Sequence, residues 1–189
     1  LPPPHRRPAA AVALGHGVLL FDGSATLADF DLLSREPESA LRLVAIAADR
    51  DLPLRRSVRS AIVNVCGDPE WTARLRARPQ AAELFVKLVT HTAETHFEQG
   101  SVMRELHDLG LLLAMLPEFG PVVGRVHHDT YHVYTVDVHS VAAVDRLGEV
   151  LRGDIVIDAE EGSRWAGSLA CHVATEVTRL PVLFFATLL

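Results

Sequence analysis

The sequence predicts an all-α fold, a helical bundle that leaves room for a short strand or hairpin near its N-terminus. From residue 34 onward, apolar residues recur at the spacing of one helix face. Proline, glycine and aspartate interrupt this pattern, as they do at the ends of helices. The 189 residues are 49% hydrophobic and 22% charged, a composition that is typical of a globular protein with a buried core.

Before residue 34 the pattern favours extended structure. Residues 1–11 are rich in proline and are expected to form an extended or disordered lead-in. The apolar run 18–21 is followed by Asp22-Gly23, a pair that commonly turns the chain between two strands. A short hairpin, or a strand and a loop, is therefore expected here.

After this region, capping residues and prolines mark where helices begin. Ser34 is expected to cap a helix that carries Pro37 in its first turn. A second helix is expected to turn its apolar side chains inward and Arg55, Arg56 and Arg59 outward. The expected helices run from Ser34 to 50, over 54–66, from the Asp68 cap, from Pro79, from the Ser101 cap, over 138–151, over 164–178, and from Pro181.

Charge and cysteine content argue against several classes of partner. A net charge of −6 and a pI near 5.9 provide no broad basic surface, so nucleic acid is not expected as a partner. Cys66 and Cys171 lie far apart, which argues against a disulfide framework or a thiolate zinc site and favours a reducing compartment. No signal peptide and no apolar run of about 18 residues is found. We expect a cytoplasmic protein that has no membrane partner.

The two ends of the chain suggest a piece of a longer protein. Residue 1 is not methionine, and the sequence stops within the apolar run 181–189. Helices of soluble proteins usually end with glycine, asparagine or a basic residue in the last turn. We therefore expect further sequence at both ends.

One adjacent His-Asp pair has a structural and a catalytic interpretation. His107-Asp108 looks like the doublet that binds metal in metal-dependent phosphohydrolases. That doublet needs a partner histidine well upstream on another helix, and His91 is separated from it by only one loop. We favour the structural interpretation, in which the helix dipole stabilises His107 near a helix C-terminus and Gly110 caps the helix.

The segment 126–140 holds the densest group of chemically active residues in the chain. Imidazole and carboxylate groups bind divalent metals and move protons near neutral pH. Small neighbours beside His139 leave room for a ligand on the helix expected to follow. The segment contains His127, His128, Asp129, Tyr131, His132, Tyr134, Asp137 and His139.

Residues 110–139 form a longer motif, GxLxxxLPEFxxxxGxxxHDxxHxYTVDxH, that includes most of these residues. With this motif, residues 109–140 resemble the bifunctional uridylyltransferase and uridylyl-removing enzymes of bacterial nitrogen signalling, at the point where their HD-type phosphohydrolase domain begins. The order of the helices from residue 32 to 91 is similar, more loosely, to the helical connector before that domain. The matching residues are Gly110, Leu112, Leu116, Pro117, Glu118, Phe119, Gly124, His128, Asp129, His132, Tyr134, Thr135, Val136, Asp137 and His139.

The resemblance implies three regions and a hydrolytic activity. Residues 1–33 would be the lead-in and hairpin, 34–120 the helical connector, and 121–189 the N-terminal part of a truncated HD domain. In this family the HD domain removes UMP from a tyrosine of the PII regulatory protein by metal-assisted hydrolysis, and a second domain attaches UMP from UTP. The metal would be Mg²⁺ or Mn²⁺ and would lower the pKa of a bound water.

The resemblance also assigns roles to individual residues. His139 matches the first metal-ligand histidine, whereas Val138 stands where the family usually has an acidic residue. The remaining ligands are expected beyond residue 189, so we expect the chain alone to hold no metal and to be inactive. Four further residues match positions that would orient the ligand or approach the substrate: His128, Asp129, His132 and Asp137.

Two other hypotheses remain open from the sequence. The chain would serve as a non-catalytic helical module for protein association if its HD-like half is kept without the catalytic residues. Alternatively, His127, His128, His132 and His139 would bind zinc, although adjacent histidines do not easily ligate one ion. The continuation of the reading frame distinguishes an enzyme from a non-catalytic module, and elemental analysis for zinc tests the zinc-binding hypothesis.

Overall fold

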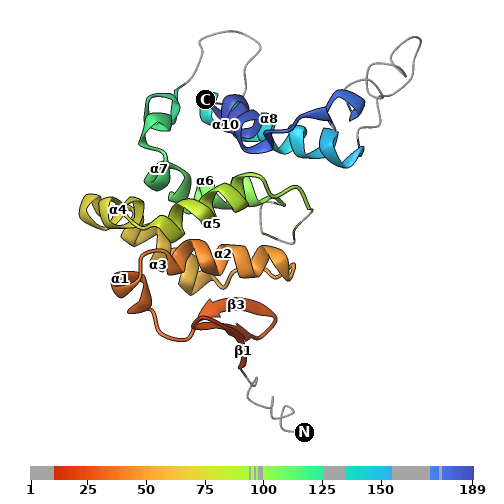
Figure 1. The fold of residues 1–189 in the computed structure, drawn as a ribbon. Helices are drawn as coiled ribbons and strands as arrows, with labels where there is room; N and C mark the ends of the chain where they lie inside the picture. Colours follow the sequence, from red (N-terminus) through yellow and green to blue (C-terminus); the bar gives the residue numbers. More distant parts are fainter. Residues whose placement is uncertain are drawn as a thin grey trace, which may run out of the picture.

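The computed structural model describes residues 11–93, 95, 97, 100–125, 135–154, 171–174 and 176–189. Within them the chain is mostly helical, as the sequence predicts, and a small antiparallel sheet precedes the helices. Figure 1 shows the sheet at one end, the helices α2 to α7 in the middle, and α8 with α10 at the other end. The bounds are β1 Val12–Gly15, β2 Val18–Phe21, β3 Ser24–Leu27, α1 Leu32–Arg35, α2 Ser39–Asp49, α3 Arg56–Cys66, α4 Pro69–Arg76, α5 Pro79–Val89, α6 Val102–Asp108, α7 Leu111–Met115, η1 Pro117–Val122, α8 Val136–Arg152 and α10 Leu180–Leu188.

Two tight turns form the three-stranded sheet in the order β1-β2-β3. The predicted turn at Asp22-Gly23 is confirmed, and both of its residues have positive φ, +51° and +76°. A second turn of the same kind, at His16-Gly17, was not predicted. Gly17 has φ +77°, a conformation that favours glycine, and a Cβ atom there would lie 2.5 Å from Cδ1 of Leu32, so the leucine side chain would have to move.

The prediction of a single helix from Ser34 to residue 50 is wrong. The chain forms α1, leaves the helical conformation, and starts α2 only at Ser39. Ser34 lies inside α1, and Pro37 lies between the two helices rather than in a first turn. A residue before proline avoids helical angles, and Glu36 accordingly adopts φ −130° and ψ 80°.

Most other helix boundaries follow the predicted caps. The Asp68 carboxylate accepts a hydrogen bond from the backbone N–H of Glu70 at 2.9 Å, and Ser101 caps α6. Gly153 ends α8 with φ +79°, although α8 begins two residues before the predicted start. The helix expected over 164–178 lies largely outside the described residues.

The apolar core runs continuously from the sheet to the last helix. Val18 of β2, Trp71 of α4 and Phe184 of α10 are each at most 2% exposed and belong to the same cluster. The Trp71 ring also donates a hydrogen bond from Nε1 to the backbone oxygen of Leu33, at 2.5 Å. This contact ties α4 to α1.

Arg59 is not on the outer face of α3, where the sequence analysis placed it. Its guanidinium forms an ion pair with the carboxylate of Glu105 in α6. The Glu105 side chain is 0% exposed and the Arg59 side chain 17%. The expectation failed because the partner lies 46 residues away in the sequence, where helical periodicity gives no information.

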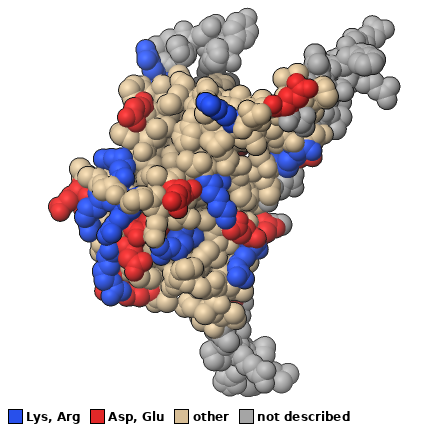
Figure 2. Space-filling model, in the orientation of Figure 1, with Lys and Arg blue, Asp and Glu red and all other residues tan. Residues whose placement is uncertain are grey.

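Charged side chains of both signs cover the face shown in Figure 2. Lys and Arg are interspersed with Asp and Glu over the middle layers, and the part of the molecule near α8 shows fewer of either kind. Among the described residues, no helix is both long and apolar enough to cross a membrane.

Candidate functional site

The first turns of α8 carry two of the predicted site residues, Asp137 and His139. Thr135 occupies the N-cap, and the His139 backbone N–H donates to the Thr135 oxygen at 3.1 Å. The His139 side chain is exposed, whereas Asp137 is 4% exposed. Two residues along a helix are separated by about 200° of rotation, so Asp137 and His139 lie on different sides of α8.

Asp137 contacts α6 through a histidine. One of its carboxylate oxygens, Oδ2, lies 2.9 Å from Nε2 of His107, which belongs to the last turn of α6. The His107 side chain is 24% exposed, and its Nδ1 lies 3.4 Å from Oδ1 of Asp108. His107 therefore links a buried carboxylate to a more exposed one.

The environment of Asp137 favours its ionised form. Burial raises the pKa of this carboxyl, but hydrogen bonds with Thr135, His107 and the backbone N–H groups of Gly124 and Val138 lower it further than burial raises it. The net effect is a pKa below the usual value for aspartate. Through its contact with His107, the buried carboxylate joins the start of α8 to the end of α6.

The sequence correctly places His107 near a helix end, but it does not reveal the partner of the imidazole, Asp137. The Gly110 backbone N–H donates to the His107 oxygen at 3.0 Å, and Gly110 has φ +75°, so the predicted cap is confirmed. The bond to Asp137 spans 30 residues. One signal in the sequence could have indicated that His107 faces a neighbouring helix. His107 lies one helical turn after the apolar residue Met103, which is 2% exposed, and so shares its side of α6.

A second polar contact holds α6 against α8. The Ser101 hydroxyl, which accepts from the Arg104 backbone N–H at 3.0 Å, lies 2.9 Å from Oδ2 of Asp145 and donates to it. The start of α6 is therefore joined to the middle of α8, and the end of α6 to its beginning. The two helices run antiparallel with a polar contact at each end.

Removing the His107 contact should loosen the start of α8. We expect His107→Ala to lower the free energy of unfolding by about 1–2 kcal/mol, because a buried carboxylate loses a hydrogen-bond partner. The matched control is Asp108→Ala, which removes a neighbouring exposed carboxylate and should cost less than about 0.5 kcal/mol. Urea unfolding of both variants measures the difference. Equal losses in the two variants would contradict the assignment.

An apolar cavity adjoins this site. It has a volume of about 550 Å³ and is lined by His107 and Asp108 together with three exposed apolar side chains, those of Val63, Leu113 and Val123. Cys66 also lines it, and burial raises the pKa of the Cys66 thiol to about 12. A thiol with this pKa is almost entirely protonated at neutral pH and is a poor nucleophile.

Three of the predicted site residues, His128, Asp129 and His132, lie outside the described residues. Among the residues that the structure does describe, no group of three or more His, Cys, Asp or Glu side chains could hold a metal ion. Of the five predicted site residues, the structure therefore locates Asp137 and His139 and separates them onto two sides of one helix.

Comparison with curated proteins gives a consistent set of relatives. The chain is 31% identical over 128 residues to the bifunctional uridylyltransferase/uridylyl-removing enzyme of Caulobacter vibrioides, which covers 68% of this chain and 13% of that protein. It is 31% identical over 172 residues to the enzyme of the same name from Nitrobacter winogradskyi, covering 86% of this chain and 16% of the relative.

A third relative, from Gluconobacter oxydans, has the same name and is 28% identical over 155 residues, or 82% of this chain and 15% of its own length. The chain thus spans about one seventh of the length of these curated relatives. No protein-family model matches the chain, and no solved structure matches it either.

Proposed function

Because this chain belongs by sequence to the family of the bifunctional uridylyltransferase/uridylyl-removing enzymes, we propose that it forms part of the uridylyl-removing half of such an enzyme. The complete protein would hydrolyse the phosphodiester that joins UMP to a tyrosine of a PII regulatory protein, and another domain would attach UMP from UTP. The single observation that carries this proposal is the motif over 109–140, which ends at His139.

The arrangement around α8 is compatible with this role. His139 is exposed on the first turns of α8, where a ligand or a further part of the protein can reach it. Asp137, two residues earlier, faces α6 and contacts His107. In this proposal Asp137 and His107 position the helix that presents His139, and they do not touch the substrate themselves.

The described residues do not make up a complete divalent-metal site. They contribute one histidine, His139, that matches a ligand position, and a catalytic metal site normally has three protein ligands or more. The proposal is that Mg²⁺ or Mn²⁺ binds in the complete enzyme and that this chain alone does not hold it.

A comparison of the complete protein with the isolated chain tests this function. With uridylylated PII protein and Mn²⁺, the protein encoded by the whole reading frame should release UMP, and the 189-residue chain should release less than about 1% as much per molecule. Calorimetry should show no stoichiometric Mn²⁺ binding to the isolated chain. Failure of the complete protein to release UMP would favour a non-catalytic module, and metal binding by the chain alone would contradict the assignment of its ligands.

A further inference from the structure

The helix α10 carries no charged side chain. Its nine residues, LPVLFFATL, are apolar except for Thr187, and the Thr187 hydroxyl donates to the backbone oxygen of Leu183 at 2.9 Å within the same helix. The one hydroxyl of the helix is thus satisfied without water. A helix of a globular protein that is apolar on all sides is normally buried on all sides.

One side of α10 is buried against the rest of the chain. Phe184 and Leu188 are each 1% exposed and belong to the apolar core. The ring centroids of Phe185 and Phe85, a residue of α5, lie 6.0 Å apart. Figure 1 shows α10 alongside α8 at the end of the molecule opposite the sheet. Contacts with α5 and α8 therefore set the position of α10.

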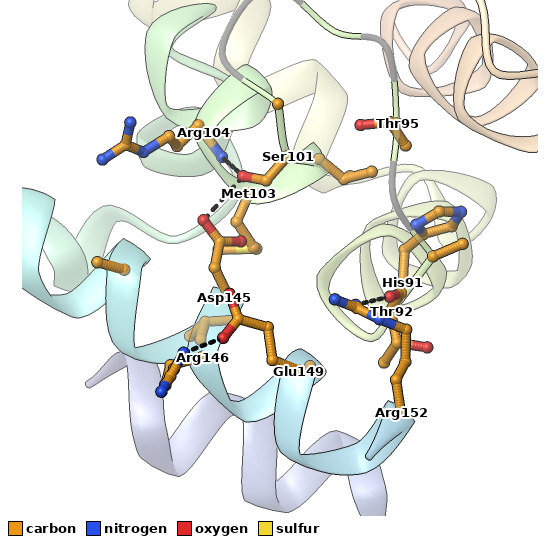
Figure 3. Close-up of a pocket in the computed structure, with 16 residues that line it drawn as sticks. His91, Thr92, Thr95, Ser101, Met103, Arg104, Asp145, Arg146, Glu149 and Arg152 are labelled. Carbon is orange, nitrogen blue, oxygen red and sulfur yellow. Dashed lines mark hydrogen bonds and ion pairs between the residues drawn. The ribbon is translucent and has the colours of Figure 1, made fainter. Parts of the chain in front are cut away.

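The neighbouring helix α8 is fastened in turn to α6. Ser101 donates a hydrogen bond to Asp145 at 2.9 Å, and both residues line a cavity of about 440 Å³ beside the two helices. Figure 3 shows this bond and the cavity. Asp137 adds the contact with His107 at the other end of α6. The helices beneath α10 thus form one packed unit.

The opposite side of α10 carries an apolar stripe that the described residues leave exposed. Val182 is 60% exposed, Leu189 is 69% exposed, and Ala186 between them is exposed as well. Leu189 continues the helical pattern, because its backbone N–H donates to the Phe185 oxygen at 3.1 Å. Residues separated by three or four positions share one side of a helix, so these three side chains form an outer stripe about two turns long.

The length of the curated relatives indicates what covers this outer stripe. The chain spans between 13% and 16% of those proteins, so most of a protein of that length lies outside the 189 residues. Covering apolar side chains is favourable in proportion to the apolar area removed from water. Two helices do this by packing the ridges of one into the grooves of the other.

We propose that the outer stripe, Val182, Ala186 and Leu189, is the docking surface for an amphipathic helix from the part of the complete protein outside these 189 residues. That helix presents apolar side chains at a spacing of three and four residues, the pattern that fits an apolar surface of this length. The docking rests on the proposed function, in which this chain is part of a longer enzyme, and it adds the surface through which the chain joins the remainder.

The reactivity of a thiol placed in the stripe tests the docking. Ala186→Cys is the probe and Ala82→Cys the matched control, because Ala82 is also an exposed alanine of a helix, α5. Maleimide labelling rates, each divided by the rate in urea, are measured by mass spectrometry of the peptides, which separates these sites from Cys66 and Cys171. Ala186→Cys should react at least about tenfold more slowly in the complete protein than in the 189-residue chain, and Ala82→Cys equally in both.

A photo-cross-linker identifies what covers the stripe. With Val182→p-benzoylphenylalanine, illumination of the complete protein should join position 182 to a peptide from outside the 189 residues in which apolar residues recur at helical spacing. A cross-link within the 189 residues or to a second molecule would overturn the proposal. Three labelling results would overturn it as well: equal rates for Ala186→Cys in the complete protein and the isolated chain, equal protection of Ala82→Cys, or a rate that falls as the isolated chain is concentrated.

Neither measurement depends on the release of UMP. Protection of position 186 in a complete protein that releases no UMP would contradict the proposed function and support the docking surface. Release of UMP without protection of position 186 would contradict the docking surface and leave the proposed function in place.

Discussion

Replacing His139 by alanine in the complete protein is expected to reduce the release of UMP from uridylylated PII protein by at least about 100-fold. His139 stands at the end of the matching motif and is exposed on α8, so the substitution removes the proposed ligand group without opening the core. The free energy of unfolding should change by less than about 0.5 kcal/mol. Initial rates of UMP release at saturating Mn²⁺ measure the effect.

The bifunctional relatives suggest an internal control for this experiment. In the proposed function the complete protein also transfers UMP from UTP through another domain, and the rate of that transfer should stay within about twofold of the parent rate if only the hydrolytic site is damaged. His172→Ala is the matched variant, because His172 is also an exposed histidine, with a side chain 72% exposed. Hydrolysis that survives His139→Ala, or that falls equally in His172→Ala, would rule out His139 as a ligand.

Replacing Arg59 by methionine is expected to destabilise the chain by about 3–5 kcal/mol, the largest stability effect that we predict. Methionine provides an unbranched apolar side chain at this position, but the fully buried Glu105 carboxylate loses its guanidinium partner. Such a charge is costly to keep in the interior. Urea unfolding followed by circular dichroism measures the loss.

Two companion variants separate charge pairing from helix propensity. Arg56→Met changes an exposed arginine in the first turn of the same helix and should cost less than about 0.5 kcal/mol. Arg59→Met combined with Glu105→Leu removes both charges and should regain most of the lost stability, because an apolar pair replaces the ion pair. If the double variant is as unstable as Arg59→Met, the buried charge is not the cause.

Much of the fold could be predicted because its signals are local. Asp68 and Ser101 cap helices through atoms only two or three residues away, and Pro79 starts α5 because proline suits the first turn. Gly153 ends α8 in the left-handed conformation that glycine adopts readily. The break before α2 was missed although its signal is also local, since the effect of Pro37 on Glu36 outweighed the helical pattern around it.

The candidate site was predictable only in part. The motif singled out Asp137 and His139 from the sequence, but it grouped them in one site, and helix geometry places them on different sides of α8. The roles of His128, Asp129 and His132 stay predictions. His107 was interpreted as a helix end, and that interpretation holds without revealing its bond to Asp137.

The sequence by itself therefore determined the helical class, most helix ends, the Asp22-Gly23 turn and the family relationship. Each of these depends on residue types within a few positions, or on a motif read in order. Only the tertiary structure decided that Arg59 points inward to Glu105, that His107 meets Asp137, and that Asp145 faces a cavity. These pairs are distant in sequence, and packing of whole helices brings them together, which periodicity along one helix does not encode.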